Sequence, residues 1–181
     1  RNGTAMLWEV DIYPREGLPG MIAQRVAADA ADLGLPKDLE VHAAYGYLIQ
    51  GEIQRSEVER IAHELLADRV VEEVDIFPLS GGNGQAPRGE EHPGRLIHVL
   101  PKPGVMDPVA LSVQTAIADF GLRAEAVRTL KKYRVVGLAE EKLPLLGSKI
   151  LANDAIEQVI VGPLPFERLE LGSPYQFRRI L

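Results

Sequence analysis

The first half of the chain alternates between short strand-like and helix-like patterns. Apolar and polar residues alternate before Pro14, which indicates a strand. An apolar face at helical spacing follows and ends at Gly34. Ser56 and Glu59 have the spacing of a capping box, which predicts a second helix start. The predicted elements are a strand at 7–13, a helix at 18–33, a strand at 39–50, a helix from 56 and a strand at 70–77.

The second half repeats this order, and its first helix carries the clearest local signal in the chain. Asp107 stands where a helix N-cap belongs, and Pro108 occupies the first helical position. The apolar positions that follow are expected to face the core, among them Val109 and Leu111. The predicted elements are a strand at 95–100, a helix at 107–120, a strand at 126–138, a helix at 143–151 and a strand at 155–161.

The two halves also resemble each other residue by residue. With Pro14 placed on Pro101, an offset of 87, residues 14–35 contain eight identities in 22 positions. A second block places 66–68 on 151–153 at a nearly equal offset. A repeat of this length indicates one small β-α-β-α-β unit present twice. Because each unit alone would bury little apolar surface, the pair is expected to pack as a pseudo-twofold dimer within one chain.

The remaining segments divide the chain into a simple domain plan. Residues 1–5 are interpreted as a tag remnant, 6–79 as the first unit, 80–94 as a flexible Gly- and Pro-rich linker, and 95–164 as the second unit. Residues 165–181 do not repeat. Their last part, 175–181, reads as a strand, so this tail is expected to lead into a further domain outside the chain.

Composition and charge narrow the function classes. The chain has 181 residues, 46% of them hydrophobic, a net charge of −6 and no cysteine. The acidic balance argues against nucleic acid or an anionic membrane as the main partner. The absence of a long apolar run argues against a membrane span, and the lack of cysteine favours a cytoplasmic protein and excludes thiol catalysis.

Candidate chemical sites are few. The four histidines do not have the spacing of metal ligands on one helix or strand face, so no metal site is expected. The Asp and Glu residues are scattered, and none forms a pair suited to acid–base work, so no catalytic residue is assigned. The one compact basic cluster is Lys131, Lys132 and Arg134 around Tyr133. It is interpreted either as a solvated strand end or as a docking patch for an acidic partner.

Three blocks in the second half resemble the signature of the PurS family, the small subunit of phosphoribosylformylglycinamidine synthase. The first is Val-Met-Asp-Pro at 105–108 with Val-Gln at 113–114; the second is Lys132-Tyr133. The third is Lys-Ile-Leu-Ala-Asn at 149–153 with Ile-Glu at 156–157. The first half departs from the pattern, with Gly20-Met21 where Asp-Pro would be.

This resemblance implies a fold and a role. The fold is α+β, with two tandem PurS-like β-α-β-α-β units, antiparallel sheets and helices packed on them. The implied role is non-catalytic assembly: the unit links a synthetase to a glutaminase and supports ammonia transfer in purine biosynthesis. The chain would need no cofactor itself, whereas the whole enzyme, an amidoligase, would use ATP and Mg. Further homo-association of the pair remains open.

The resemblance also suggests which residues contact a partner. Lys132 and Tyr133 match the family pattern, and Lys131 lies beside them. Gln114 lies on a largely apolar helix, where it would either satisfy a buried backbone group or face the partner. Asn153 belongs to the third block. The candidate partner contacts are therefore Lys131, Lys132, Tyr133, Gln114 and Asn153.

A tandem ACT-like regulatory module that binds an amino acid or nucleotide is the main alternative. Such a unit would have a β-hairpin in its middle, whereas residues 126–138 read as one long strand. Gly46 would mark a bend or bulge of that kind in the first half. An RNA-binding α/β sheet is a third class, which the net charge and the 6% aromatic content disfavour.

Overall fold

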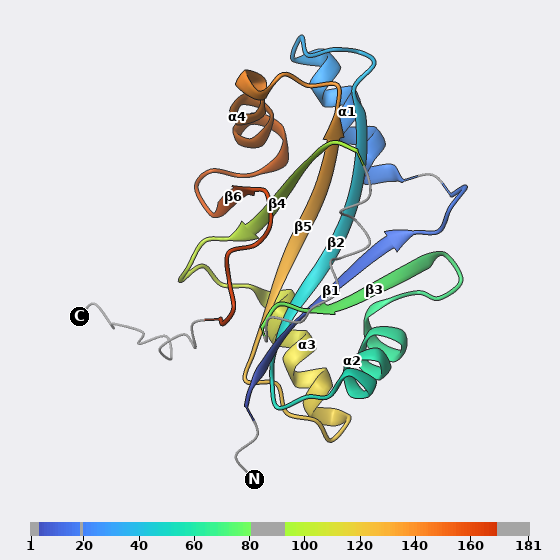
Figure 1. Ribbon diagram of the computed structural model, residues 1–181, viewed down its shortest axis with the longest axis vertical. Coiled ribbons are helices and arrows are strands. Elements are labelled where there is room, and N and C mark those ends of the chain that lie inside the picture. Colours follow the sequence, from blue (N-terminus) through green and yellow to red (C-terminus); the bar gives the residue numbers. More distant parts are fainter. Residues whose placement is uncertain (1–3, 19, 81–92, 170–181) are drawn as a thin grey trace, which may run out of the picture.

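The computed structural model describes residues 4–18, 20–80 and 93–169 and shows one six-stranded antiparallel sheet in the order β3-β1-β2-β5-β4-β6 (Figure 1). The α+β class is confirmed. The strands are β1 (Met6–Pro14), β2 (Glu40–Gly51), β3 (Glu72–Pro78), β4 (Arg95–Pro101), β5 (Ala126–Val136) and β6 (Glu157–Val161). The helices are α1 (Met21–Asp32), α2 (Arg55–Ile61), α3 (Pro108–Asp119) and α4 (Leu143–Leu146), with π-helical turns at Ala62–Leu66 and Gly147–Leu151 that continue α2 and α4.

The sheet is symmetric about its centre. β2 and β5 are the two longest strands, and they pair antiparallel over eleven residue pairs, from Glu40↔Val136 to Gln50↔Ala126. On either side the order is the same: β1 then β3 beyond β2, and β4 then β6 beyond β5. The halves thus join edge to edge through their long strands, which leaves only β3 and β6 as edges within the described part of the chain.

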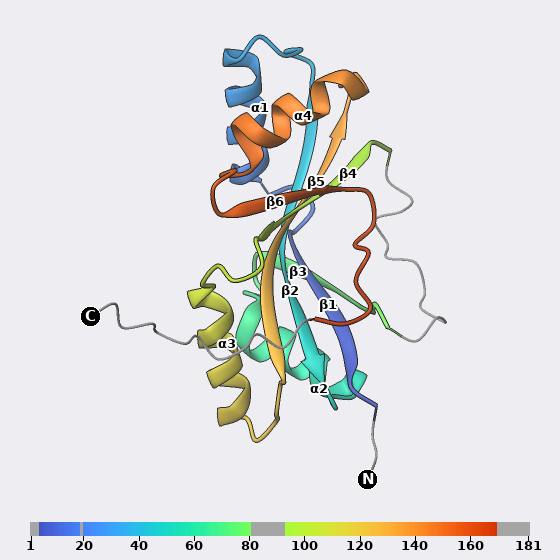
Figure 2. The same cartoon turned by 90° about the vertical axis from the view of Figure 1, so that its left-hand side faces the viewer.

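The helices lie together on one face of the sheet, and the two halves exchange their first helices (Figure 2). Ala110 and Ile117 of α3 pack into a core formed mostly by β1, β2 and α2 of the first half. Val26 and Ala30 of α1 pack correspondingly into a core formed mostly by β4, β5 and α4 of the second half. Each core therefore needs both halves of the chain, which agrees with the expectation that one unit alone buries too little apolar surface.

Of two expected helix caps, one needs correction and one is confirmed. The N-cap of α2 lies two residues earlier than expected, because the capping box is formed by Gln54 and Glu57 rather than by Ser56 and Glu59. The neighbouring Ile53 is buried in the core, which fixes the chain at that earlier position. The Asp107 cap of α3 is confirmed, since its Oδ1 accepts a hydrogen bond from the amide of Ala110 at 3.1 Å.

The buried face of α3 is narrower than the sequence suggested. Val109 and Leu111 are more than half exposed, while Ala110 and Ile117 are buried. The helix approaches the sheet through these two positions, seven residues apart, so the larger apolar side chains at its start point outward. Ile22 in the first turn of α1 is likewise about half exposed.

The other face of the sheet carries no helix within the described residues. A small core of Leu7, Leu48, Leu100, Leu130 and Leu169 lies there. Residues 162–169 fold back over this face, and the amide of Leu169 donates a hydrogen bond to Gln50 Oε1 at 2.6 Å. The start of the expected tail thus packs on the sheet, and the strand expected at 175–181 lies outside the described residues. No helix in the described ranges is long and apolar enough to cross a bilayer.

Candidate functional site

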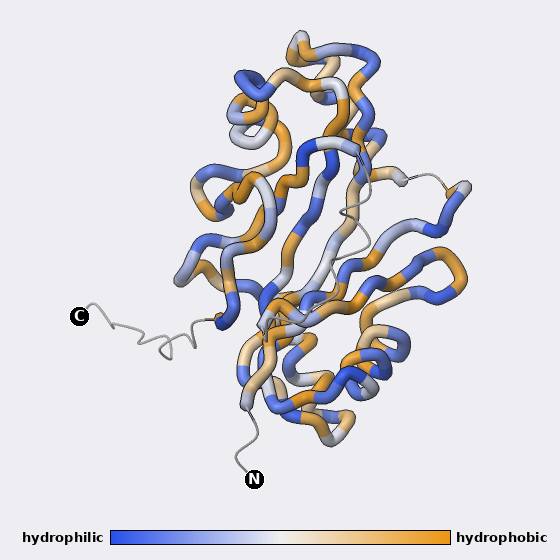
Figure 3. Tube along the Cα trace, in the orientation of Figure 1, coloured by the Kyte–Doolittle hydropathy of each residue, from blue (hydrophilic) through white to orange (hydrophobic). Residues whose placement is uncertain are grey.

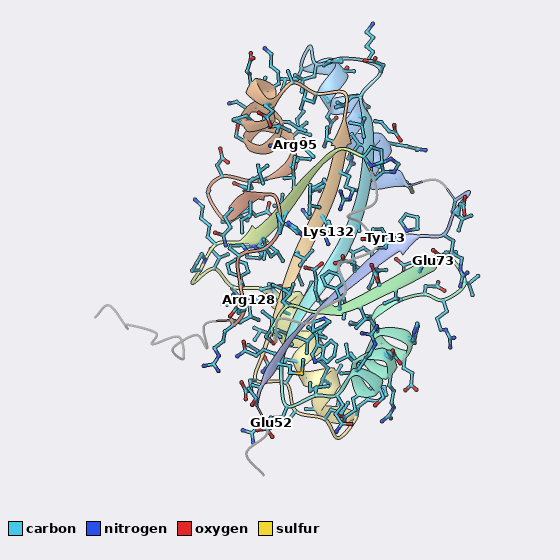
Figure 4. The ribbon with its side chains drawn as sticks, in the orientation of Figure 1. Tyr13, Glu52, Glu73, Arg95, Arg128 and Lys132 are labelled. Atoms are coloured by element: carbon cyan, nitrogen blue, oxygen red, sulfur yellow. The ribbon has the colours of Figure 1, made fainter. Side chains whose placement is uncertain are left out.

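A buried ion cluster occupies the middle of the helix-free face. The ammonium of Lys132 on β5, which is labelled in Figure 4, lies 2.7 Å from Glu9 Oε2 and 2.7 Å from Asp11 Oδ2, both on β1. All three side chains are almost fully inaccessible to solvent. The ring of Phe77 on β3 lies beneath the ammonium, 5.1 Å from ring centroid to Nζ. The cluster therefore joins the two halves by charge as well as by the backbone ladder.

The strand register explains how Lys132 reaches β1 across an intervening strand. Lys132 pairs with Ala44 on β2, and Asp11 pairs with Gly46 on the same strand, so all four positions share one face. Ala and Gly leave room for the lysine side chain to cross β2. The space above Gly46 is already filled: a Cβ there would lie 2.7 Å from the carbonyl oxygen of Val10 and 3.0 Å from Asp11 Oδ1. Gly46 thus serves the cluster, and the bend or bulge considered for it is absent from the continuous strand β2.

The charges in the cluster influence one another strongly. Burial, followed by the neighbouring Asp11 carboxylate, raises the pKa of Glu9 well above its usual value. Burial also opposes the charged form of Lys132, yet the Asp11 and Glu9 carboxylates outweigh this and raise the pKa of Lys132. Lys132 is therefore held as an ammonium, and two carboxylates compete for its single charge.

His98 completes the polar centre of this face. It pairs with Lys132 in the β4–β5 ladder, and its Nδ1 lies 2.9 Å from the carbonyl oxygen of Gly162. Burial, followed by the charge of Lys132, lowers the pKa of His98 to about 4, so the ring is neutral at pH 7. A neutral ring that donates from Nδ1 leaves Nε2 as an acceptor. Nε2 is buried and has no hydrogen-bond partner among the described residues.

The predicted basic cluster around Tyr133 does not form a surface patch, because two of its residues are buried. Lys132 is 5% exposed and Tyr133 is 3% exposed, because Lys132 turns into the ion cluster and Tyr133 packs among the helices on the opposite face. Neither side chain is presented on the surface of this chain, which corrects the interpretation of the cluster as a continuous docking patch. Lys131 is exposed, with its Nζ 3.9 Å from Glu157 Oε2 on β6.

Gln114 fulfils the backbone role that the sequence left open. Its side-chain amide donates hydrogen bonds to the carbonyl oxygens of Ala124 at 2.9 Å and Glu125 at 3.3 Å. These bonds attach α3 to the segment that enters β5. The side chain remains partly exposed.

Asn153 forms a turn that is repeated in both halves. Its Oδ1 accepts a hydrogen bond from the amide of Ala155 at 3.1 Å, and its own amide donates to Glu157 Oε1 at 3.0 Å. In the first half the same two bonds link Asp68 to the amide of Val70 and to Glu72 Oε1. The repeated sequence block at 66–68 and 151–153 is thus explained by a shared turn at the end of each π-helical segment.

Sequence reasoning missed Glu9 and Asp11, the two residues that define the cluster. Both occupy the polar positions of an alternating strand, which normally face water. The one sequence signal that pointed to Glu9 and Asp11 was the presence of an opposite charge, Lys132, on a long strand of the other half. Only the pairing of β2 with β5 brings these strands together.

The arrangement fixes charge between the halves, and the described residues hold no group of three or more His, Cys, Asp and Glu side chains that could bind a metal ion. Comparison with known families shows that residues 96–162 fit the family model PurS, phosphoribosylformylglycinamidine (FGAM) synthase. No curated protein matches the chain. The matched range runs from β4 through the end of β6, so it covers one complete half of the sheet.

Proposed function

Because the second half of the chain is PurS-like, we propose that the protein is a non-catalytic assembly unit of FGAM synthase in purine biosynthesis. In this role it links the synthetase to the glutaminase and supports the transfer of ammonia between them. The observation that carries the proposal is the family match over an entire β-α-β-α-β set. We further propose that the first half is a diverged second copy, because its elements and its place in the sheet mirror those of the matched half.

Each half presents one long, continuous central strand, which supports this role over the ACT-like alternative. β2 runs from Glu40 to Gly51 and β5 from Ala126 to Val136 without a hairpin. β2 and β5 pair with each other and so join the two halves. The unit therefore resembles a preassembled pair, whose outer surfaces are available for contact with partners.

Among the candidate partner contacts, we propose Lys131, Gln114 and Asn153. Lys131 is the charged residue of the three, and half of its side chain is exposed despite the Glu157 contact. The partners would be a synthetase, in the same or a separate chain, and a glutaminase, in the cytoplasm. ATP and Mg would act in the synthetase and not in this unit.

The test is to combine the protein with the cognate synthetase and glutaminase and to follow assembly by light scattering. Glutamine-dependent and ammonia-dependent synthesis are measured in parallel. We expect the protein to restore assembly and the glutamine reaction while leaving the ammonia reaction unchanged. Where the unit is covalently part of the synthetase, the same comparison uses the longer chain with the unit removed.

A charge reversal at Lys131 tests the proposed contact within the same assay. Lys131→Glu should weaken assembly, and the matched control Lys142→Glu, at an exposed position in the turn before α4, should not. If the unchanged protein assembles with neither the synthetase nor the glutaminase, and the glutamine reaction does not respond to it, the bridging proposal is wrong.

A further inference from the structure

The two halves of the sheet contain equivalent clefts where an outer strand leaves its central neighbour. β1 pairs with β2 as far as Ile12↔Tyr45; beyond that point β1 continues with β3 alone (Figure 1). β4 likewise pairs with β5 as far as Val99↔Lys131 and then continues with β6 alone. Where each outer strand departs, the backbone edge of the central strand beside it is left without a pairing strand. The two halves cover this edge in different ways.

In the second half the cleft is closed by the N-terminus of α3. Asp107 Oδ2 accepts hydrogen bonds from the amide of Thr129 at 2.9 Å and from its hydroxyl at 2.8 Å. Val109 of the same helix lines the remaining hollow, which has a volume of about 210 Å³. The carboxylate that caps the helix thus also accepts the hydrogen bonds of Thr129 on the unpaired edge of β5.

In the first half the equivalent helix start is Gly20, which carries no side chain and is not among the residues that line the hollow. The hollow there is about 590 Å³, within the range of small-molecule sites.

The walls of this cavity carry opposite charges. Among the residues that line the cavity, the charged ones from β1, β3 and the turn after β1 are acidic, and those from β2 and β5 are basic or neutral. Arg15 in the same turn does not line the cavity, but its guanidinium lies 4.0 Å from Glu73 Oε1. The acidic wall holds Glu16, Glu73 and Asp75, beside the hydroxyl of Tyr13; the opposite wall holds His42, Lys132 and Arg134.

We propose that this cleft is a binding site for a free α-amino acid, with its carboxylate toward Arg134 and His42 and its ammonium toward Glu73 and Asp75. A zwitterion is the small ligand whose charges match two facing walls of opposite sign. Lys132 contributes less to this recognition, since its ammonium is already bound by two carboxylates. The four recognition residues also have partners within the chain: Glu73 Oε1 lies 4.0 Å from Arg15, and His42 Nε2 lies 2.7 Å from Glu40 Oε1. Asp75 and Arg134 take part in other interactions as well, so a ligand would share or exchange these contacts. The inference does not depend on the proposed role in FGAM synthase.

The test is an NMR titration of the ¹⁵N-labelled protein with glycine, L-alanine, L-glutamine and L-glutamate. We expect saturable shifts of the amides of Tyr13, Ala43 and Ala44 with at least one of them. The same amino acid is then supplied as its N-acetyl derivative, which lacks the ammonium, and as its amide, which lacks the carboxylate. Each blocked form should bind at least about tenfold more weakly, which corresponds to 1.4 kcal/mol.

Protein variants give an independent reading. Arg134→Gln and Asp75→Asn should each weaken binding about tenfold or more. The controls Arg128→Gln and Glu52→Gln, which lie away from the cleft, should bind like the unchanged protein (Figure 4). The proposal is overturned if none of the four amino acids produces saturable shifts in these amides. It is equally overturned if the blocked derivatives bind as tightly as the free amino acid.

Discussion

Lys132 and Asp11 lie 121 positions apart in the chain, and their charged groups meet at 2.7 Å in the buried centre of the sheet. Lys132→Met should leave the carboxylates of Glu9 and Asp11 buried without a counter-charge. We expect the free energy of unfolding to fall by about 3–5 kcal/mol, measured by urea denaturation at pH 7. Lys131→Met, one position away and exposed, should change it by less than about 1 kcal/mol. Similar values for the two variants would contradict a buried ion cluster.

The pH dependence of stability should report the neutral, buried state of His98. Its pKa is about 4 in the folded protein and near 6.5 in the unfolded chain, so the unfolded chain binds the proton first as pH falls. The contribution of the neutral His98 to the free energy of unfolding is fully present above pH 6.5. It is lost as pH falls toward 4, by up to about 3 kcal/mol.

The measurement compares the protein with His98→Asn, whose side-chain amide can still donate to the Gly162 carbonyl oxygen but cannot titrate. The unfolding free energies of the two proteins should converge or cross as pH is lowered from 7 to 4. The raised pKa of Glu9 acts in the opposite direction in both proteins, because it favours the folded state as pH falls through its folded value. A difference that stays constant over this range would contradict the assignment.

Gly46 should not tolerate a side chain. An alanine Cβ would lie 2.7 Å from the carbonyl oxygen of Val10, a backbone atom that cannot move aside cheaply. Gly46→Ala should therefore lower the free energy of unfolding by about 1–3 kcal/mol. Gly147→Ala is the matched comparison, since its Cβ would meet Val159 at 3.4 Å and alanine favours the helical backbone. We expect it to be neutral or stabilising in the same thermal or urea unfolding experiment.

Asp107 serves both α3 and β5, so its removal should cost more than an ordinary helix cap. Asp107→Ala loses the bond from the amide of Ala110 and leaves the amide of Thr129 without its acceptor. We expect a loss of about 2–3 kcal/mol, against about 1 kcal/mol for a cap alone. Thr129→Val removes only the hydroxyl bond and should cost less. An Asp107→Ala protein as stable as the Thr129→Val protein would show that the backbone contact is unimportant.

Neither half should fold by itself. Residues 6–80 lack α3, and residues 93–169 lack α1, so each would expose the core that the missing helix fills. We expect each fragment alone to lack the dispersed amide NMR spectrum of a folded protein, and the two mixed or coexpressed fragments to recover it. A folded, monomeric single fragment would contradict the exchange of helices.

The sequence predicted most of the architecture because its repeat and its local signals agree. The Asp107-Pro108 start of α3 and the two long central strands were recovered within a few residues. The shared turn at Asp68 and Asn153 explains why a short block could be recognised in both halves. Such features depend on neighbours in the chain, which a single sequence displays.

The site was less accessible to sequence reasoning, since it depends on which strands become neighbours. Lys132 looked like part of a surface patch because Lys131 and Arg134 are adjacent to it. The alternation of a strand places Lys132 and Tyr133 on opposite faces, but only the tertiary structure shows that both faces are covered there. The exchange of α1 and α3 was also invisible, because either helix could have packed on its own half with the same periodicity.

A single chain built from two matching halves is freed from a constraint that binds every symmetric dimer. In a homodimer each substitution occurs twice, once on each side of the axis. Here the position equivalent to Lys132 holds Gly46, and the position equivalent to Asp11 holds His98. One half can therefore supply a lysine while the equivalent position of the other half is a glycine that leaves room for its side chain. A gene that encodes a single copy could not specify two different residues at that position.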